Sequence, residues 1–269
     1  MRHFWQRLLT KPPLDPYKHF RDGSHMIPIR DHNPSERTPY VTLSLIALNI
    51  AIFLGGLALL QTDRALALFY YDYALLPFRL SNGENYSALV SSIFLHGGFL
   101  HLAGNMLFLW IFGDNLEDEM GHIPFLIFYL LCGIGASLAQ VVTDPSSQVP
   151  TVGASGAIAG VMGGYLLLYP KAKVDIFIFF IVFFRILPIP AWIMLGLWFA
   201  IQLFNGFNVD TSMGGVAYWA HAGGFVFGFL GTLPLWFKRG GALFWRQTHG
   251  HPPHPEAQYR RSNVPIVRR

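Results

Sequence analysis

Three histidines and an asparagine lie in stretches of the sequence that are otherwise apolar. His96, His101 and His221 fall in long windows without Asp, Glu, Lys or Arg, and Asn105 follows His101 by four residues. Polar groups in such surroundings are costly and are therefore default functional candidates. His101 and Asn105 would share one face of a helix. Two donors on one face suit the stabilisation of a developing oxyanion, and a structural hydrogen bond between helices is the alternative.

A serine in a glycine-rich frame is the other candidate. Ser155 stands in the run Gly153-Ala154-Ser155-Gly156, where a loop is expected to enter a helix. Amide groups at a helix N-terminus are unpaired and favour negative charge. Small residues recur every four positions on two segments, at Gly156, Gly160 and Gly164 and at Ala220, Gly224 and Gly228. Close packing of these faces would bring Ser155 and His221 within hydrogen-bond reach. Two packing faces with an incidental serine and histidine fit the spacing equally well.

The elements that must position these residues are predicted to be transmembrane helices. Charged residues make up 13% of the 269 residues and hydrophobic residues 52%, and the mean hydropathy is +0.38, whereas about a quarter of a soluble domain is charged. Windows near the length of a membrane span predict an all-α bundle of six transmembrane helices, at 41–60, 90–112, 123–142, 155–169, 189–204 and 217–237. The apolar run Ile176 to Phe184 is too short to span and is expected to be interfacial, with a seventh helix as the alternative.

Positive charge predicts the orientation of this bundle. Of the 19 Lys and Arg residues, all but Arg64 and Arg79 fall on one side of it, so both termini are expected to be cytosolic. The predicted organisation is a cytosolic segment over 1–38, a membrane domain over 39–238, and a disordered cytosolic tail over 239–269. The charge is explained by this topology, so we expect a lipid bilayer and no nucleic acid as partner.

The sequence also excludes several kinds of disulfide, metal and catalytic site. Cys132 is the only cysteine, which excludes a disulfide framework and a multi-cysteine metal site. No HExxH motif occurs, and the proposed spans contain none of the paired aspartates of an aspartyl mechanism. We therefore expect no metal and no cofactor.

Three separated motifs resemble the rhomboid family of intramembrane serine proteases. The segment from His96 to Asn105, HGGFLHLAGN, is similar to the family's signature in its second span, and FGDN and Glu117 follow it. The run from Gly153 to Gly156 is similar to the nucleophile motif, and AHAGG at 220–224 is similar to the motif of the base. The three motifs occur in the family's order, and the resemblance covers about 39–237.

The resemblance implies a serine endopeptidase with a Ser–His dyad. Ser155 would attack the peptide carbonyl, and His221 would take and return the proton. The Ser155 backbone N–H, Asn105 and His101 would hold the oxyanion, with His96 supporting that cavity. The implied substrates are transmembrane proteins cut near the outer membrane face, and we expect the protein in the bacterial plasma membrane.

One departure from the family leaves a question about the base. Some members have a tyrosine one turn after the nucleophile that stacks on the histidine, but here that residue is Ala159, so His221 must be oriented by something else. Two other functions compete with proteolysis: an inactive relative that binds membrane proteins, and a transporter that relays protons through buried histidines.

Overall fold

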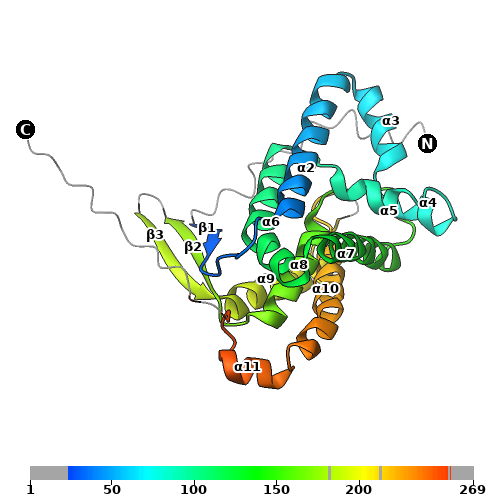
Figure 1. Cartoon of the computed structure of the whole chain (residues 1–269). Coiled ribbons are helices and arrows are strands. Elements are labelled where there is room, and N and C mark those ends of the chain that lie inside the picture. The colour runs from blue at the N-terminus through cyan, green and yellow to red at the C-terminus, as the bar shows by residue number, and fades with distance from the viewer. Residues whose placement is uncertain (1–23, 181–182, 212–213, 254, 256–269) are drawn as a thin grey trace, which may run out of the picture.

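The computed structural model describes residues 24–180, 183–211, 214–253 and 255. Figure 1 shows helices α6, α7, α8 and α10 grouped together, with α2 and α3 at one end and α11 at the other. The elements are β1 (Ser24–Asp31), α2 (Tyr40–Leu59), α3 (Asp63–Tyr73), α4 (Pro77–Ser81), α5 (Ala88–Ser91), the 3₁₀ helix η2 (Ser92–Phe94), α6 (Phe99–Met120), α7 (His122–Thr143), α8 (Ser155–Leu168), β2 (Lys173–Phe180), β3 (Phe183–Pro190), α9 (Ala191–Asn208), α10 (Tyr218–Lys238) and α11 (Ala242–Thr248).

Helices form in all six segments that were expected to span, although residues 95–98 within the second segment are not helical. Among the described helices, α2, α7 and α10 are long and apolar enough to cross a membrane, and α6 with the short helices before it makes a fourth if that bent pair is one span. Helix α8 has 14 residues and is shorter than the roughly 20 residues that a membrane span needs. Length and composition therefore support three or four crossings, and six crossings with cytosolic termini stay a prediction.

The expected continuous span over 90–112 is wrong. Helix η2 ends at Phe94 and α6 begins at Phe99, and the two parts are bent by 95°. Gly97 and Gly98 lie in the break, and paired glycines disfavour helix because of their backbone entropy. His96 therefore lies in an irregular segment, and His101 and Asn105 lie in the first two turns of α6.

Helix α8 lies at the centre of the bundle because its small residues let other backbones approach. A Cβ atom at Gly160 would lie 3.1 Å from the carbonyl oxygen of Gly224 on α10. Cβ atoms at Gly224 and Gly228 would overlap the backbone of Gly156 and Gly160. The predicted packing of the two small-residue faces is confirmed.

Helix α2 is tied to the end of α6 by a buried carboxylate. Glu117 is 1% exposed and accepts hydrogen bonds from the backbone N–H of Val41 at 2.8 Å and of Thr42 at 2.7 Å. The Thr42 hydroxyl and the His122 ring are also in hydrogen-bond contact with it, at 2.8 Å and 2.6 Å. A negative group satisfies the unpaired amides of a helix N-terminus, so this contact fixes where α2 begins.

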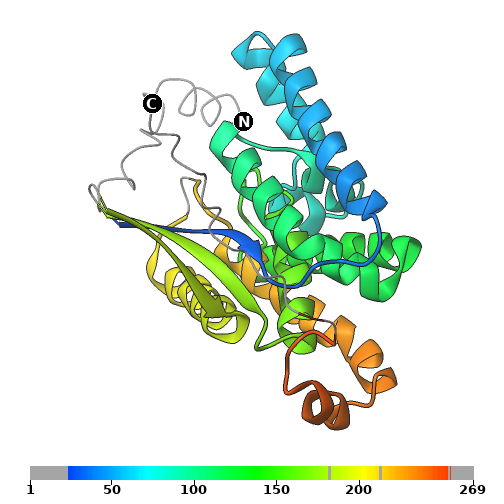
Figure 2. The ribbon, with the colours of Figure 1, turned by 60° about the vertical axis from the view of Figure 1, so that its left-hand side comes forward.

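A three-stranded antiparallel sheet corrects the all-α prediction. Its strand order is β1-β2-β3, and it lies beside α9 at one side of the helical bundle (Figures 1 and 2). The run Ile176 to Phe184, expected to be interfacial, belongs to β2 and β3 apart from residues 181–182, which lie outside the described part. β-Branched and aromatic residues favour strands, and Pro188 and Pro190 oppose a helical continuation.

The side chain of Asp175 joins the first two strands. Its carboxylate accepts a hydrogen bond from Arg30 Nε at 2.7 Å and contacts His32 Nε2 at 2.8 Å. Although burial acts in the opposite direction, these contacts hold the pKa of Asp175 below its usual range. Part of the segment 1–38, expected as a solvated cytosolic segment, is therefore a strand of the sheet, and residues 1–23 lie outside the described part.

Asp31, at the end of β1, anchors the sheet to the helices. It accepts hydrogen bonds from the Tyr165 hydroxyl at 2.8 Å and from Asn115 Nδ2 at 3.1 Å. Burial, together with the neighbouring Asp114 carboxyl, raises the pKa of Asp31 from 3.8 to about 8. The carboxyl of Asp31 therefore takes up a proton at a higher pH in the folded chain than in the unfolded chain.

Replacing Asp31 with asparagine is expected to flatten the pH dependence of stability. Between about pH 4 and pH 8 the folded chain keeps a proton that the unfolded chain releases, so wild-type stability falls as pH rises through this window and levels off above it. Asparagine keeps an acceptor and does not titrate. The melting temperature of the variant relative to wild type should rise by a few degrees between about pH 5 and pH 8.5, in thermal unfolding followed by circular dichroism. A difference that is the same at both pH values would contradict the assignment.

The C-terminal segment contains a helix that was not expected. The tail 239–269 was expected to be disordered, but α11 forms within it and packs on the bundle. Trp245 Nε1–H donates to the carbonyl of Leu167 at 2.9 Å, and the Trp245 ring lies 4.9 Å from that of Trp236. A partly buried aromatic contact and a satisfied indole N–H explain this docking. Residues 254 and 256–269 lie outside the described part.

Candidate active site

Ser155 is the first residue of α8, and the loop before it is held on both sides. Thr151 and Leu75 exchange backbone hydrogen bonds of 2.8 Å and 3.1 Å, and the N–H of Gly153 donates to the carbonyl of Ser92 at 3.0 Å. Gly153 has a φ of +128°, which only glycine adopts without strain. The chain therefore turns at Gly153 and presents Ser155 at a helix N-terminus, where backbone amides have no intrahelical partner.

The structure brings Ser155 and His221 together. Ser155 Oγ lies 2.8 Å from His221 Nε2, although the residues are 66 positions apart in the sequence. His221 lies in the first turn of α10, and α10 packs directly on α8 through the glycine contacts described above. The close backbone approach thus sets the distance between a hydroxyl and an imidazole nitrogen.

His101 and Asn105 border the same turn. A Cβ atom at Gly153 would lie 2.7 Å from His101 Nε2 and 3.5 Å from Asn105 Nδ2, so these nitrogens face the backbone two residues before Ser155. Asn105 is 8% exposed, and its Nδ2 is buried with no hydrogen-bond partner among the described residues. A buried donor without a partner is unusual, and this one lies beside Gly153, two residues before Ser155.

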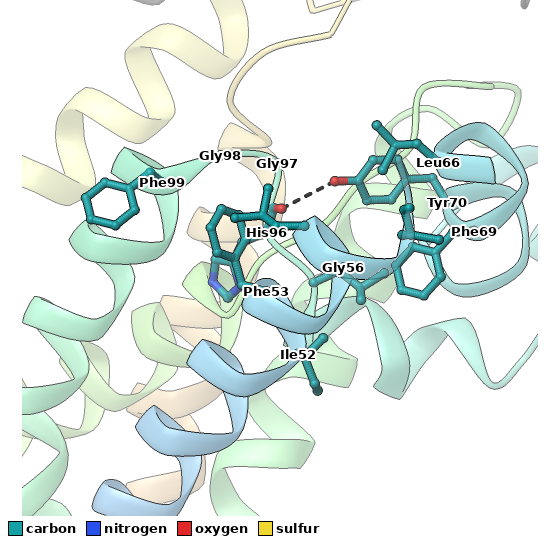
Figure 3. Close-up of a pocket in the computed structure, with 13 residues that line it drawn as sticks. Ile52, Phe53, Gly56, Leu66, Phe69, Tyr70, His96, Gly97, Gly98 and Phe99 are labelled. Atoms are coloured by element: carbon teal, nitrogen blue, oxygen red, sulfur yellow. Dashed lines mark hydrogen bonds between the residues drawn. The ribbon is translucent and has the colours of Figure 1, made fainter. Parts of the chain in front are cut away.

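The side chain of His96 lies next to that of His101. Its buried ring packs edge-on against the His101 ring, with centroids 5.2 Å apart. Its carbonyl accepts a hydrogen bond from the Tyr70 hydroxyl at 3.3 Å (Figure 3). Burial raises the pKa of Tyr70, which keeps this donor protonated. The structure thus brings His96 together with His101.

An apolar cavity adjoins His96. It has a volume of about 370 Å³ and lies between α2, α3 and the break before α6 (Figure 3). The residues that line it include Phe53, Gly56, Phe69 and Phe99. The break in the helix therefore both positions His96 and creates this cavity.

Gly156 belongs to the site through packing alone. A Cβ atom there would lie 2.5 Å from the Cβ of Ala136 on α7 and 3.7 Å from the carbonyl oxygen of Ala220. Glycine at this position lets α7 and α10 approach the first turn of α8. Gly153 and Gly156 thus flank Ser155 for different reasons, the first for its backbone conformation and the second for space.

Sequence reasoning did not connect two residues on α9 with the histidine. His221 Nδ1 lies 2.8 Å from Gln202 Oε1, and the Trp198 ring lies 5.8 Å from the His221 ring at an interplanar angle of 31°. The signal for Gln202 was present, because it is an amide inside a run of apolar residues. It was overlooked because no spacing rule connects α9 with α10.

The Rhomboid domain pattern matches residues 83–237 of the chain. The chain belongs to the rhomboid family. The matched region contains His96, His101, Asn105, Ser155 and His221. With its apolar helices, this rhomboid is an integral membrane protein.

Several relatives align with this rhomboid over part of their length. The rhomboid protease GluP of Bacillus subtilis is 36% identical over 155 residues, which cover 58% of this chain and 27% of that protein. The mitochondrial Rhomboid protein 1 of Saccharomyces cerevisiae is 33% identical over 149 residues, which cover 53% of this chain and 40% of that protein. RHOMBOID-like protein 4 of Arabidopsis thaliana is 34% identical over 177 residues, or 65% and 41% of the two chains. This rhomboid thus spans less than half the length of these relatives, and they come from a bacterium, a yeast mitochondrion and a plant.

Proposed function

We propose that this rhomboid is an intramembrane serine endopeptidase that hydrolyses peptide bonds of transmembrane protein substrates. The observation that carries the proposal is the 2.8 Å contact between Ser155 Oγ and His221 Nε2 at the start of two packed helices. Membership of the rhomboid family supports it, because relatives such as GluP carry the name of proteases. Both residues of the dyad are present, which disfavours an inactive membrane-protein binder.

The proposed reaction uses Ser155 as nucleophile and His221 as general base. The Ser155 oxygen forms a bond to the carbonyl carbon of the substrate while its proton passes to His221 Nε2. The imidazolium then gives this proton to the nitrogen of the leaving peptide, and the C–N bond breaks. A water molecule attacks the resulting ester with His221 again taking a proton, which releases the acid product and restores the Ser155 hydroxyl.

The oxyanion of each tetrahedral intermediate is assigned to three donors. They are the backbone N–H of Ser155, Asn105 Nδ2 and His101 Nε2. The position of both side-chain nitrogens around Gly153 supports this assignment, and so does the unpartnered Asn105 Nδ2. A donor aimed at the developing charge stabilises the transition state without reorganisation.

The proposed setting is a bilayer crossed by six helices, with both termini cytosolic and the site near the outer face. The excess of Lys and Arg on one side of the helices supports this orientation. Substrates are proposed to be transmembrane proteins cut near the outer end of a helix. We place the protein in the bacterial plasma membrane.

Covalent labelling tests the nucleophile directly. Detergent-purified protein is treated with a fluorophosphonate, digested and analysed by mass spectrometry, and the same preparation is assayed for cleavage of a fluorogenic transmembrane-segment substrate. Labelling at Ser155, parallel loss of cleavage, and insensitivity to chelators are expected. Cleavage that persists after full labelling would overturn the assignment of Ser155. Absence of both labelling and cleavage across several substrates would favour the inactive binder or the transporter.

Replacing Asn105 with alanine is expected to lower kcat about 10²–10³-fold with little change in KM, because the lost donor acts mainly on the transition state. Steady-state kinetics on the same substrate measure this. Gly104→Ala is the control, since it changes the adjacent residue of α6 where a Cβ atom would meet nothing within 4 Å. Equal losses in both variants would mean that the effect comes from disturbing α6.

A further inference from the structure

The second ring nitrogen of His221 has a specific partner on α9. Gln202 is 6% exposed, and its Oε1 lies 2.8 Å from His221 Nδ1. The other ring nitrogen faces Ser155 Oγ at the same distance. The imidazole is thus held between a hydroxyl and an amide, and neither partner is a carboxylate.

The orientation of the Gln202 amide follows from its other contact. Gln202 Nε2 donates to the carbonyl oxygen of Trp198 at 3.2 Å, one turn earlier on α9. A carbonyl oxygen only accepts hydrogen bonds, so the NH₂ group must face Trp198 and Oε1 must face the histidine. The amide cannot be flipped without placing two acceptors against each other.

This orientation selects the tautomer of His221. Because Oε1 of Gln202 only accepts, His221 Nδ1 must carry the hydrogen and donate it. A neutral imidazole with a proton on Nδ1 has its lone pair on Nε2. That lone pair faces the Ser155 hydroxyl, which is the arrangement a general base needs.

The plane of the ring is constrained by the same turn of α9. The Trp198 ring lies against His221 with centroids 5.8 Å apart and planes 31° apart. Trp198 therefore contacts the His221 ring with its tilted indole and anchors the Gln202 amide with its carbonyl. These contacts provide an orientation for His221 although residue 159 is alanine and cannot stack on the ring.

We propose that Gln202 is a positioning residue for the general base: held by the Trp198 carbonyl, it fixes His221 in the Nδ1–H tautomer with Nε2 toward Ser155. The inference rests on the proposed Ser155–His221 mechanism and adds a third residue to it. A neutral amide performs this role without placing a charge in an apolar bundle, where an unpaired charge is costly. The role is to orient the base, and Gln202 does not touch the reacting atoms.

Substitution of Gln202 tests whether it orients His221 or only stabilises the fold. Gln202→Leu removes the acceptor at similar volume and is expected to lower kcat about 10- to 100-fold with KM unchanged within about twofold. Asn208→Leu is the matched control, because Asn208 Nδ2 donates to the Phe204 carbonyl one turn earlier on the same helix, as Gln202 does to Trp198. The control should keep the kinetics of wild type.

Gln202→Glu tests whether an acceptor at this position is what matters. It restores an acceptor for Nδ1–H and should recover kcat to within about tenfold of wild type. A carboxylate also favours the imidazolium form, so the acid limb of the kcat/KM profile should move to higher pH in this variant. An acid limb that did not move would contradict the contact between residue 202 and His221 Nδ1.

The tautomer itself gives a readout that does not depend on turnover. In protein with ¹⁵N-labelled histidine rings, the signals of His221 are identified by their loss in His221→Ala. Wild type and Asn208→Leu should show Nδ1 protonated and Nε2 unprotonated, and Gln202→Leu should show a mixture. An unchanged tautomer in Gln202→Leu together with wild-type kcat would overturn the inference.

The two proposals can fail separately. If Ser155→Ala keeps its activity, the proposed mechanism is wrong, whatever Gln202 does. If Ser155→Ala is inactive while Gln202→Leu has the kinetics and the tautomer of wild type, the role of Gln202 alone is wrong. If Gln202→Leu does not fold, the tautomer in Gln202→Glu decides, because loss of the Nδ1–H form with an acceptor present would contradict the inference.

Discussion

Ser155→Ala is expected to lower kcat for cleavage of a transmembrane substrate at least about 10³-fold, because alanine has no nucleophile to form the acyl-enzyme. His221→Ala should lose nearly as much, and the double variant should be no worse than either single one, since residues that act as a unit are not additive. KM should stay close to wild type, because neither side chain is assigned to substrate binding. Steady-state kinetics in detergent or proteoliposomes measure all three variants.

Ser44→Ala provides the matched control for this experiment. Ser44 is exposed on α2, and its hydroxyl donates to the Tyr40 carbonyl at 2.7 Å, away from Ser155. This variant should cleave at the wild-type rate. Residual activity above about one hundredth of wild type in Ser155→Ala would indicate another nucleophile.

Much of the site could be predicted because the residues that form it recur at spacings that a helix brings onto one face. His101 and Asn105 are four residues apart, so a helix places them together wherever it begins. The small residues every four positions on two segments required close packing, and α8 and α10 pack in this way. Their contact brings Ser155 to His221 across 66 residues. The spacing alone left this pairing and an incidental serine and histidine equally open, and the resemblance to the rhomboid family favoured the pairing.

The structure differs from the prediction where contacts between distant segments decide which of two secondary structures, or which neighbour, a segment adopts. An eight-residue apolar strand and half of a buried helix have similar composition, and the pairing of β2 with β1 and β3 selects the strand. The helix break before α6 depends on Gly97 and Gly98 together, whereas hydropathy averages over them. Gln202 was missed because its role depends on which face of α9 meets α10, and no periodicity in either segment specifies that contact.

The fold depends on the α8–α10 contact, and Gly228→Ala is expected to disrupt it. A Cβ atom at Gly228 would overlap the backbone of Gly160, and a clash between two backbones cannot be relieved by turning a side chain. We expect a loss of about 3 kcal/mol in the free energy of unfolding, or about 6–12 °C in melting temperature, measured by thermal unfolding. Activity should fall as well, because separating α10 from α8 lengthens the contact between His221 and Ser155.

Gly196→Ala separates this clash from a general effect of alanine in a helix. A Cβ atom at Gly196 on α9 would meet nothing within 4 Å, and alanine favours helix by about 1 kcal/mol over glycine. This variant should therefore be as stable as wild type or more so, with unchanged kinetics. If Gly228→Ala were also neutral, α8 and α10 could not be in backbone contact, and the 2.8 Å distance between Ser155 and His221 would lose its structural basis.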